Sequence, residues 1–472
     1  MKLDYSRFLT RNITLLVAVA IVLLFFWGLG SVPFLSVNEA RRAVTVREMR
    51  EAGSWLLPYM NGELYLSKPP FFYWVGLVST GVLGSLSEWS VRLPSALAAT
   101  VCCIGIYLYG SRLAGRQAGL LAAVFLAANG AFSLFARRSE IEMFLTLLCF
   151  GALLAAWQYV FRQGRIGWSR LSYVLLGCAL LTKGPVCLLW VTAPILAYAL
   201  IYKDSRAKAY LCDGWGWIIA LVLGSSWYVA VSFSQGWGIW ASIISEDIVN
   251  KIDGQGAEAW YAYLLYLAGD FFPFWLIIFV RPRAFWALIR SRREAGMLLC
   301  CCLLPLLVFS MFTEKHGKYL LPIYPAVALL LALHWTALLE EAKGRWRVGL
   351  ATVPYIMLAG FLVFYVFIEG QVLAHRFGGL EQVATLAAKQ PDQKAYSVGE
   401  PDIRLVYYMG RPVEALTVAE VSGVKQSDAR LFVQEPLPPE LQDLASCKIG
   451  EIDPYLKPGR SALLLRLGAD CR

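Results

Sequence analysis

Ionisable side chains stand at several points where this sequence turns from polar to strongly apolar. Glu142 follows Arg138 at the start of one apolar run, Lys183 ends another, and Lys318 begins a third beside Tyr319. An ionisable group at the edge of an apolar segment is costly to place there, which makes it a functional candidate. A structural interpretation is also available: Glu142 could pair with a neighbouring arginine, and Lys318 and Tyr319 could anchor a helix end.

A polar stretch near the N-terminus holds a second group of candidates. Asn38 and Glu39 open a segment with helical character over 40–52. Ser36 precedes Glu39 by three residues, which is the spacing of a capping box. Glu39 is therefore interpreted in two ways, as a helix cap or as a carboxylate available for catalysis.

Tyr65 and Lys68 follow in a turn-rich segment, and Lys68 directly precedes the pair Pro69-Pro70. Proline restricts the residue before it to an extended backbone and suits the first turn of a helix. A lysine beside a helix N-terminus is well placed to bind phosphate. The alternative is a lysine that anchors the loop at the lipid surface.

Carboxylates and lysines in this combination suit a phosphate-bearing lipid substrate. Carboxylates can serve as a base or as metal ligands, and lysines can hold a phosphate leaving group. The three histidines are scattered, and none of the eleven cysteines has metal-ligand spacing, so no metal site is assigned. No cofactor is assigned either, although the carboxylates leave a divalent cation open.

Membrane-spanning helices must position these candidates. The chain has 472 residues, of which 58% are hydrophobic and 16% are charged, whereas about 25% of the residues of soluble domains are charged. Runs of about 20 apolar residues recur, and each is long enough to cross a bilayer. We predict eleven spans, at about 13–31, 91–110, 117–135, 141–161, 171–183, 185–202, 215–233, 261–280, 295–312, 319–336 and 348–368.

The distribution of basic residues predicts the side on which each loop lies. If the N-terminus is cytoplasmic, every segment on its side carries at least two Lys or Arg residues, as the positive-inside rule requires. The net charge of +10 is therefore attributed to topology, and no nucleic-acid partner is predicted. Glu39, Lys68, Glu142, Lys183 and Lys318 all map to the opposite, outer face.

The chain is predicted to form two domains. Residues 1–368 form the membrane domain, with outer loops at 32–90 and 234–260. Long ordered loops over a membrane scaffold usually carry function. Residues 369–472 form a small α/β domain, which an odd number of spans places on the outer side.

The C-terminal domain changes from apolar runs to proline-rich turns and short alternating segments. Cys447 and Cys471 fall within it, and they are either bridged, as an oxidising compartment permits, or free. Strands are expected at 395–398, 431–433 and 462–467, and a helix at 380–389.

Several short motifs follow one another in a fixed order over most of residues 1–340. They are Asn38–Ala43, Asn61–Pro70, Ser90–Ser95, Glu142–Met143, Leu181–Pro185, Trp227–Tyr228 and Lys318–Pro325. In these motifs the sequence resembles the bacterial GT-C membrane glycosyltransferases, which include the lipid A aminoarabinose transferases and, more distantly, the protein O-mannosyltransferases. The chain departs from the family pattern at Asn38, Ser67 and Glu142, where relatives carry Asp, Glu and Asp.

The resemblance implies a polytopic α-helical protein of the bacterial inner membrane, of GT-C type, with a cytoplasmic N-terminus and a periplasmic C-terminal α/β domain. Such a protein, surrounded by membrane lipids, transfers a sugar from a polyprenyl (undecaprenyl) phosphate donor to a lipid A-like or other cell-envelope lipid or glycan acceptor, with inversion at the anomeric carbon. The catalytic residues implied are Glu39, Glu142 and Asn38, and the substrate-binding residues are Tyr65, Lys68, Arg138, Lys183, Lys318 and Tyr319.

Two points stay open at this stage. Asparagine cannot accept a proton, so either Glu39 replaces the family's aspartate as base or the acceptor, if it is a phosphate, needs none. The acceptor could also be a protein or a polysaccharide. A transporter or flippase for an anionic lipid is a third reading, but it should show inverted repeats and broken helices at the bilayer centre, and no internal repeat is seen.

Overall fold

The computed structural model of the chain describes residues 2–241, 243, 258–388, 393–425, 427–452 and 461–468. The chain divides into two compact units. The first, here called the helical unit, consists of Met1–Trp27, Ser67–Val75 and Arg92–Phe364. The second, the mixed unit, consists of Gly28–Leu66, Gly76–Val91 and Tyr365–Arg472.

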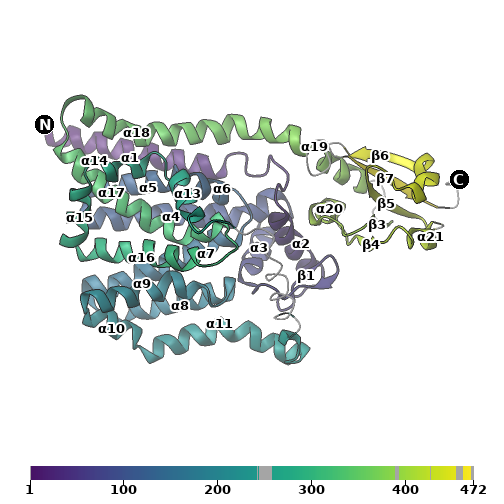
Figure 1. Ribbon diagram of the computed structural model, residues 1–472, viewed down its shortest axis with the longest axis horizontal. Coiled ribbons are helices and arrows are strands. Elements are labelled where there is room, and N and C mark those ends of the chain that lie inside the picture. Colours follow the sequence, from purple (N-terminus) through teal and green to yellow (C-terminus); the bar gives the residue numbers. More distant parts are fainter. Residues whose placement is uncertain are drawn as a thin grey trace. The chain divides into compact units, whose positions relative to one another are not determined.

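The helical unit consists of apolar helices that lie side by side and roughly parallel (Figure 1). Its elements are α1 (Lys2–Phe26), α4 (Glu88–Ala114), α5 (Arg116–Ala127), α6 (Gly130–Ala136), α7 (Ile141–Trp157), η1 (Gln158–Gln163), α8 (Ile166–Lys183), α9 (Cys187–Tyr202), α10 (Ser205–Leu211), α11 (Gly214–Gln235), α13 (Ala262–Asp270), η2 (Phe274–Leu276), α14 (Ile277–Val280), α15 (Pro282–Ser291), α16 (Arg293–Ser310), η3 (Gly317–Ile323), α17 (Tyr324–Glu341) and α18 (Gly344–Val363). The first residues of α4 belong to the mixed unit, and α3 (Phe71–Val82) likewise runs from one unit into the other.

The predicted spans all coincide with helices. Among the described residues, six helices are long and apolar enough to cross a membrane, and two further pairs, α5 with α6 and α13 with η2 and α14, are bent by 72° and 102° and would each make one span. The remaining three predicted spans coincide with α1, α8 and α9. The first predicted span extends too far at its C-terminal end, because α1 ends at Phe26 and turns follow. The chain is a polytopic helical membrane protein, and the total of eleven crossings stays a prediction.

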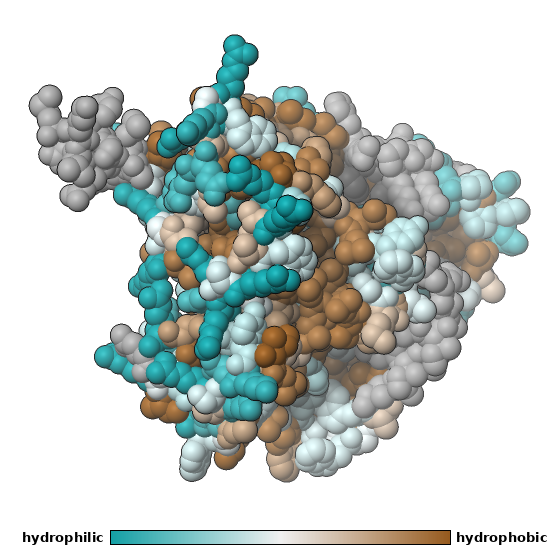
Figure 2. All heavy atoms as spheres, turned by 60° about the vertical axis from the view of Figure 1, so that its left-hand side comes forward, coloured by the Kyte–Doolittle hydropathy of each residue, from teal (hydrophilic) through white to brown (hydrophobic). Residues whose placement is uncertain are grey.

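Exposed polar side chains gather at one end of the helical unit, beside a broad apolar surface (Figure 2). This end carries α10 and α15 together with the start of α18. Its basic residues come from segments that the positive-inside rule assigns to one side of the membrane, among them Arg283, Arg290 and Arg345, all of them exposed.

The mixed unit combines the segment after α1 with the C-terminal part of the chain. Its elements are α2 (Val37–Glu51), β1 (Tyr59–Met60), β2 (Glu63–Leu64), η4 (Phe364–Ile368), α19 (Glu369–Ala388), β3 (Lys394–Val398), α20 (Ile403–Met409), β4 (Glu414–Leu416), α21 (Val421–Val424), β5 (Ala429–Gln434), η5 (Pro439–Cys447), β6 (Lys448–Ile452) and β7 (Ala462–Leu467). Five strands form one sheet in the order β4-β3-β5-β7-β6, with β3 parallel to β4 and β5, and β7 antiparallel to β5 and β6. The three predicted strands are confirmed as β3, β5 and β7.

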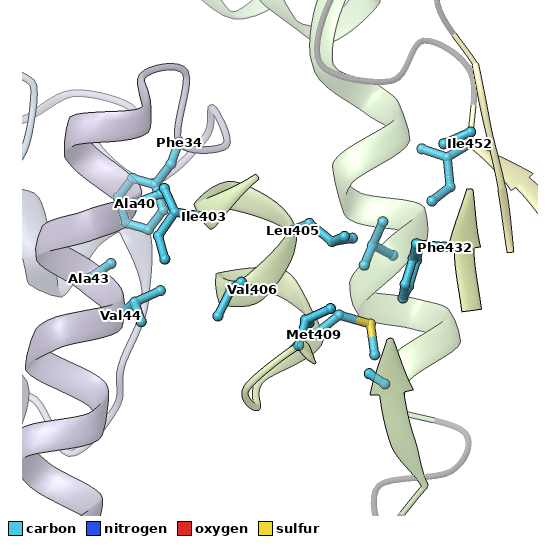
Figure 3. Packing of buried hydrophobic residues seen from close by; sticks show 14 of the residues in the cluster. Phe34, Ala40, Ala43, Val44, Ile403, Leu405, Val406, Met409, Phe432 and Ile452 are labelled. Carbon is cyan, nitrogen blue, oxygen red and sulfur yellow. The ribbon is translucent and has the colours of Figure 1, made fainter. Parts of the chain in front are cut away.

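Alternation along the strands gives the sheet an apolar core on each face. On one face, Phe432 of β5 packs with Leu405 and Met409 of α20, and α20 in turn packs against Ala43 and Val44 of α2 (Figure 3). The other face is covered by η5 and α21. The loop after α1 and the C-terminal sheet therefore share one core, although more than 300 residues separate α2 from α20 in the sequence.

Two predicted features fall partly outside the described residues. Of the outer loop at 234–260, residues 242 and 244–257 are not described, and α11 extends into its start, ending at Gln235. Cys447 is disulfide-bonded, whereas Cys471 lies outside the described residues. The other nine cysteines are free thiols.

Candidate functional site

A cluster of lysines and glutamates lies where three helices of the helical unit begin or end. The Lys183 ammonium donates a hydrogen bond to Glu142 Oε1 at 2.9 Å. The Lys318 Nζ lies 3.6 Å from the same oxygen and 3.8 Å from Glu140 Oε2. The Lys183 Nζ also lies 4.2 Å from the centre of the Tyr319 ring. We call Glu140, Glu142, Lys183, Lys318 and Tyr319 the lysine cluster.

Helix ends bring the lysine cluster together from distant parts of the sequence. Glu142 is in the first turn of α7, Lys183 is the last residue of α8, and Lys318 is the second residue of η3. The segments pack directly, since α7 contacts both α8 and η3. The site is therefore at the ends of spans and not in the middle of them, as the sequence predicts for an outer-face site.

The local backbone brings Glu140 into the lysine cluster. Glu140 and Glu142 are two residues apart, and on a helix they would face different directions. Glu140 is however the N-cap of α7, with an extended backbone at φ −122° and ψ 135°. The change of backbone conformation at the cap turns both carboxylates toward Lys318. Glu140 thus joins the site although it was not selected from the sequence, and the signal that could have found it is its place directly before an apolar helix.

Lys68 is close enough to Lys183 for the two ammonium groups to repel each other. It is half-buried and stands before the two prolines, and α3 begins directly after them at Phe71, as predicted. The Trp74 amide bonds to the Pro70 carbonyl, which completes the first turn of this helix at 2.9 Å. Lys68 therefore lies near the lysine cluster in the helical unit.

The two neighbouring arginines differ in their use. Arg137 is buried and donates to the carbonyls of Leu24 and Trp27 at 2.9 and 2.8 Å, where it holds the C-terminal end of α1. Arg138 is half-buried, and its carbonyl accepts the Glu140 amide at 2.9 Å. Arg137 is thus structural, and Arg138 stays a predicted substrate-binding residue at the start of the segment that presents Glu140 and Glu142.

Asn38 and Glu39 lie in the mixed unit, in the first turn of α2. The Ser36 hydroxyl accepts the Glu39 amide at 3.1 Å, and the fully buried Glu39 carboxylate accepts the Leu35 amide at 3.2 Å. The helix-cap interpretation of Glu39 is therefore confirmed. Tyr65 follows β2 in the same unit and is half-buried; its amide donates to the Pro58 carbonyl at 2.8 Å. Catalytic or binding roles for these residues stay predictions.

A half-buried carboxylate that sequence reasoning missed ties the two bent helix pairs together. Asp270, the last residue of α13, accepts hydrogen bonds from the Tyr324 hydroxyl at the start of α17 and from the Ala131 amide in α6. It therefore links the segment that leads to Glu140 with the segment that follows Lys318. In the sequence, only the position of Asp270 at the end of an apolar run could have marked it as a candidate site residue. Among the described residues, no group of three or more His, Cys, Asp or Glu side chains is arranged to hold a metal ion.

Comparisons with known proteins agree with this architecture. Residues 67–230 match the family described as dolichyl-phosphate-mannose-protein mannosyltransferase. An undecaprenyl phosphate-alpha-4-amino-4-deoxy-L-arabinose arabinosyl transferase of Pectobacterium carotovorum is 27% identical over 340 residues, which are 70% of this chain and 60% of that protein. An uncharacterized protein of Aquifex aeolicus is 27% identical over 330 residues, 67% of this chain and 63% of that protein. The chain thus spans less than two thirds of the length of these relatives.

Solved structures share the fold over almost the whole chain. ArnT from Cupriavidus metallidurans, in its complex with undecaprenyl phosphate, has a TM-score of 0.78 at 19% identity, with 96% of this chain and 98% of that chain covered. The archaeal oligosaccharyltransferase AglB from Archaeoglobus fulgidus has a TM-score of 0.57 at 10% identity, covering 91% and 70%.

The helical unit, its lysine cluster at the helix ends and the C-terminal sheet define a polytopic membrane protein with the GT-C fold. Within that fold class, the chain is similar to undecaprenyl phosphate-aminoarabinose arabinosyl transferases over about 70% of its length, and to the mannosyltransferase family over residues 67–230.

Proposed function

We propose that this protein is a glycosyltransferase that moves a sugar from a polyprenyl phosphate carrier, of the undecaprenyl phosphate type, to a lipid A-like acceptor of the cell envelope. The observation that carries the proposal is the lysine cluster with Lys68 beside it. Lysine ammonium groups gathered at the ends of membrane spans suit a phosphate at the membrane surface. The names of the relatives support the same donor class.

The proposed reaction breaks the bond between the anomeric carbon and the phosphate oxygen, and the polyprenyl phosphate leaves with the electron pair. The acceptor oxygen forms the new bond from the opposite face of the sugar, with inversion. Lys68, Lys183 and Lys318 neutralise the negative charge on the departing phosphate, which is where such groups contribute most to rate. The resemblance adds Tyr65, Arg138 and Tyr319 as further contacts of the substrate.

Glu142 is proposed to orient lysines and not to remove a proton. It lies between Lys183 at 2.9 Å and Lys318 at 3.6 Å, where it can hold both ammonium groups in place. Glu39 is engaged as a helix cap, and Asn38 cannot accept a proton. We therefore propose that the attacking group is a phosphate of the acceptor, which is already anionic and needs no base. Asn38 and Glu39 then shape the start of α2.

The site at the helix ends also bears on the alternative of a transporter. A carrier of an anionic lipid is expected to hold its charged groups near the bilayer centre on broken helices. Both breaks, between α5 and α6 and between α13 and α14, instead adjoin Asp270, outside the lysine cluster. The location of Glu142, Lys183 and Lys318 in terminal turns supports chemistry at a membrane face.

The test is transfer by the purified full-length protein. It is incubated with undecaprenyl phosphate carrying aminoarabinose or a hexose, together with lipid A, a dephosphorylated lipid A or a protein acceptor, and products are identified by mass spectrometry. We expect transfer to lipid A that is lost on the dephosphorylated acceptor. Transfer to protein alone would replace the acceptor assignment, and no transfer from any polyprenyl donor would refute the enzyme.

A further inference from the structure

The short helix α15 (Pro282–Ser291) has one apolar face, and that face is used within the protein. Phe285 and Ile289 are buried, and the Phe285 ring meets the His334 ring of α17 edge to face at 5.4 Å. Arg292 separates α15 from α16, which is a candidate membrane span. The helix α15 therefore lies at one end of a candidate membrane span. This holds whichever side of the membrane that end faces.

The outer face of α15 consists of arginines around a tryptophan. With about 3.6 residues per turn, Arg283 and Arg290 have almost the same direction, opposite Phe285, and Trp286 lies to one side of them. Both arginines are exposed, and Trp286 is 52% exposed. Tryptophan and arginine are the residues that proteins place at the level of lipid headgroups.

Arg283 and Arg290 of α15 and Arg292 at its C-cap differ from the neighbouring arginines in their ion pairs. Arg281 pairs with Glu341, and Arg293 lies 3.7 Å from Asp204. Arg283, Arg290 and Arg292 form no ion pair within the part of the chain that the structure describes. All three are exposed, and α15 lies at the polar end of the helical unit (Figures 1 and 2).

We propose that Arg283, Trp286, Arg290 and Arg292 form a binding surface for the headgroups of anionic phospholipids. The arginines supply charge complementary to the phosphates, and Trp286 fits the boundary between headgroup and acyl chain. Each arginine near an anionic membrane surface raises affinity by about fivefold. This surface is separate from the lysine cluster, and the proposal does not rest on the proposed enzymatic function.

The test uses native mass spectrometry of the full-length protein, stripped of lipid in detergent and titrated with cardiolipin, phosphatidylglycerol or phosphatidylcholine. The variant R283Q/R290Q/R292Q is compared with R165Q/K203Q/K208Q. The second triple removes the same charge from other exposed residues of the loops that the positive-inside rule assigns to the same side. We expect the α15 triple to weaken anionic-lipid binding at least tenfold, and the control triple to change it less than twofold.

A third variant separates a headgroup site from a general charge effect. W286A keeps the charge and is expected to reduce binding of the anionic lipids about threefold. Thermal unfolding in detergent checks that each variant is folded. The proposal is overturned if the two triples weaken binding equally, if phosphatidylcholine binds wild type as well as cardiolipin does, or if a soluble acidic peptide competes fully with the lipids.

Discussion

Charged side chains that reach main-chain carbonyls hold the mixed unit together, whereas those of the lysine cluster in the helical unit end on other side chains. Arg47 of α2 donates to the Val406 and Tyr407 carbonyls of α20 at 3.0 and 3.2 Å. Arg404 of α20 donates to the Leu35 carbonyl at 3.1 Å, next to the start of α2. Each guanidinium also pairs with a nearby carboxylate, Arg47 with that of Glu48 and Arg404 with that of Asp402. These arginines therefore serve the assembly of the unit, as Arg137 does at the end of α1 in the helical unit.

The charged groups of the lysine cluster in the helical unit end on other side chains. Lys183 and Lys318 share the Glu142 carboxylate, and the charge of Lys68 acts on Lys183. Keeping several ammonium groups at the edge of a membrane is costly. The difference teaches where function is to be sought: charges fixed on main-chain carbonyls are structural, whereas ammonium groups gathered on side chains are candidates to bind an anion.

Lys183→Met is expected to have the largest effect, and it tests the role of the lysine cluster in this comparison. Because Lys183 is proposed to neutralise the leaving phosphate, kcat should fall by about 100- to 1000-fold, the usual loss for one electrostatic donor. Transfer is measured with purified protein and a polyprenyl phosphate sugar. The control Lys208→Met removes an exposed lysine of α10 and should leave kcat within twofold.

Loss of Lys183 also leaves Glu142 buried with one cation fewer, which can destabilise the fold by about 3–5 kcal/mol. The double variant Glu142→Gln/Lys183→Met removes both charges and should recover most of that stability in thermal unfolding. It should remain inactive. If the double variant transfers sugar at the wild-type rate, the lysine is structural and the comparison fails.

Glu142→Gln should have a smaller effect on transfer. The amide keeps an oxygen that accepts a hydrogen bond from Lys183, but it no longer attracts Lys318 by charge. We expect kcat to fall about tenfold, which corresponds to about 1.4 kcal/mol of transition-state stabilisation. An inactive variant that is still folded would instead indicate that Glu142 acts on the substrate directly, and this outcome is read from the same transfer assay.

Much of the fold was predictable from sequence because lipid constrains it strongly. Each predicted span coincides with a helix or a bent helix pair, since apolar runs of sufficient length have few alternatives in a bilayer. The bends themselves were not predicted. They depend on Asn129, whose side chain caps α6 by accepting the Phe132 amide at 2.8 Å, and on Asp270, neither of which is distinctive in the sequence.

The candidate site was predictable in its residue types but not in its pairing. Lys183, Glu142 and Lys318 were selected because they stand at the edges of apolar runs, and they are found together. The inclusion of Glu140 depends on where α7 begins, and helix ends are the least certain feature of a sequence. The packing of α20 on α2 joins segments more than 300 residues apart, and no local pattern encodes that contact.

Asn61→Gly tests the structural side of the comparison. The Asn61 side chain donates to the Val413 carbonyl at 3.0 Å and accepts the Val413 amide at 2.8 Å. Asn61 has a positive φ of 58°, so glycine removes the side chain without adding backbone strain. We expect a loss of about 2 kcal/mol in unfolding free energy, from two backbone groups left without partners. Denaturant unfolding measures the loss, and transfer per folded molecule should change less than threefold.

Tyr408→Phe should destabilise the mixed unit somewhat less. The Tyr408 hydroxyl donates to Glu88 at 2.7 Å and accepts the Phe34 amide at 2.9 Å. Burial, together with the nearby Glu88, raises the pKa of Tyr408 above its ordinary value of 10.0. The hydroxyl therefore stays protonated below pH 10, and its contribution of about 1.5 kcal/mol should not vary between pH 6 and 9. A difference in stability between wild type and variant that disappears within this range would contradict the assignment.

The smallest effect is expected at Glu39, and there the identity of the substitution decides between two roles. Glu39→Gln keeps an oxygen that can accept the Leu35 amide but cannot act as a base, whereas Glu39→Ala removes both capacities. If the carboxylate is only a cap, alanine should cost about 1 kcal/mol, and glutamine should be close to wild type in both stability and transfer. A folded Glu39→Gln variant with transfer reduced by 100-fold or more would assign Glu39 the role of base, and would move part of the chemistry from the lysines of the helical unit to a carboxylate of the mixed unit.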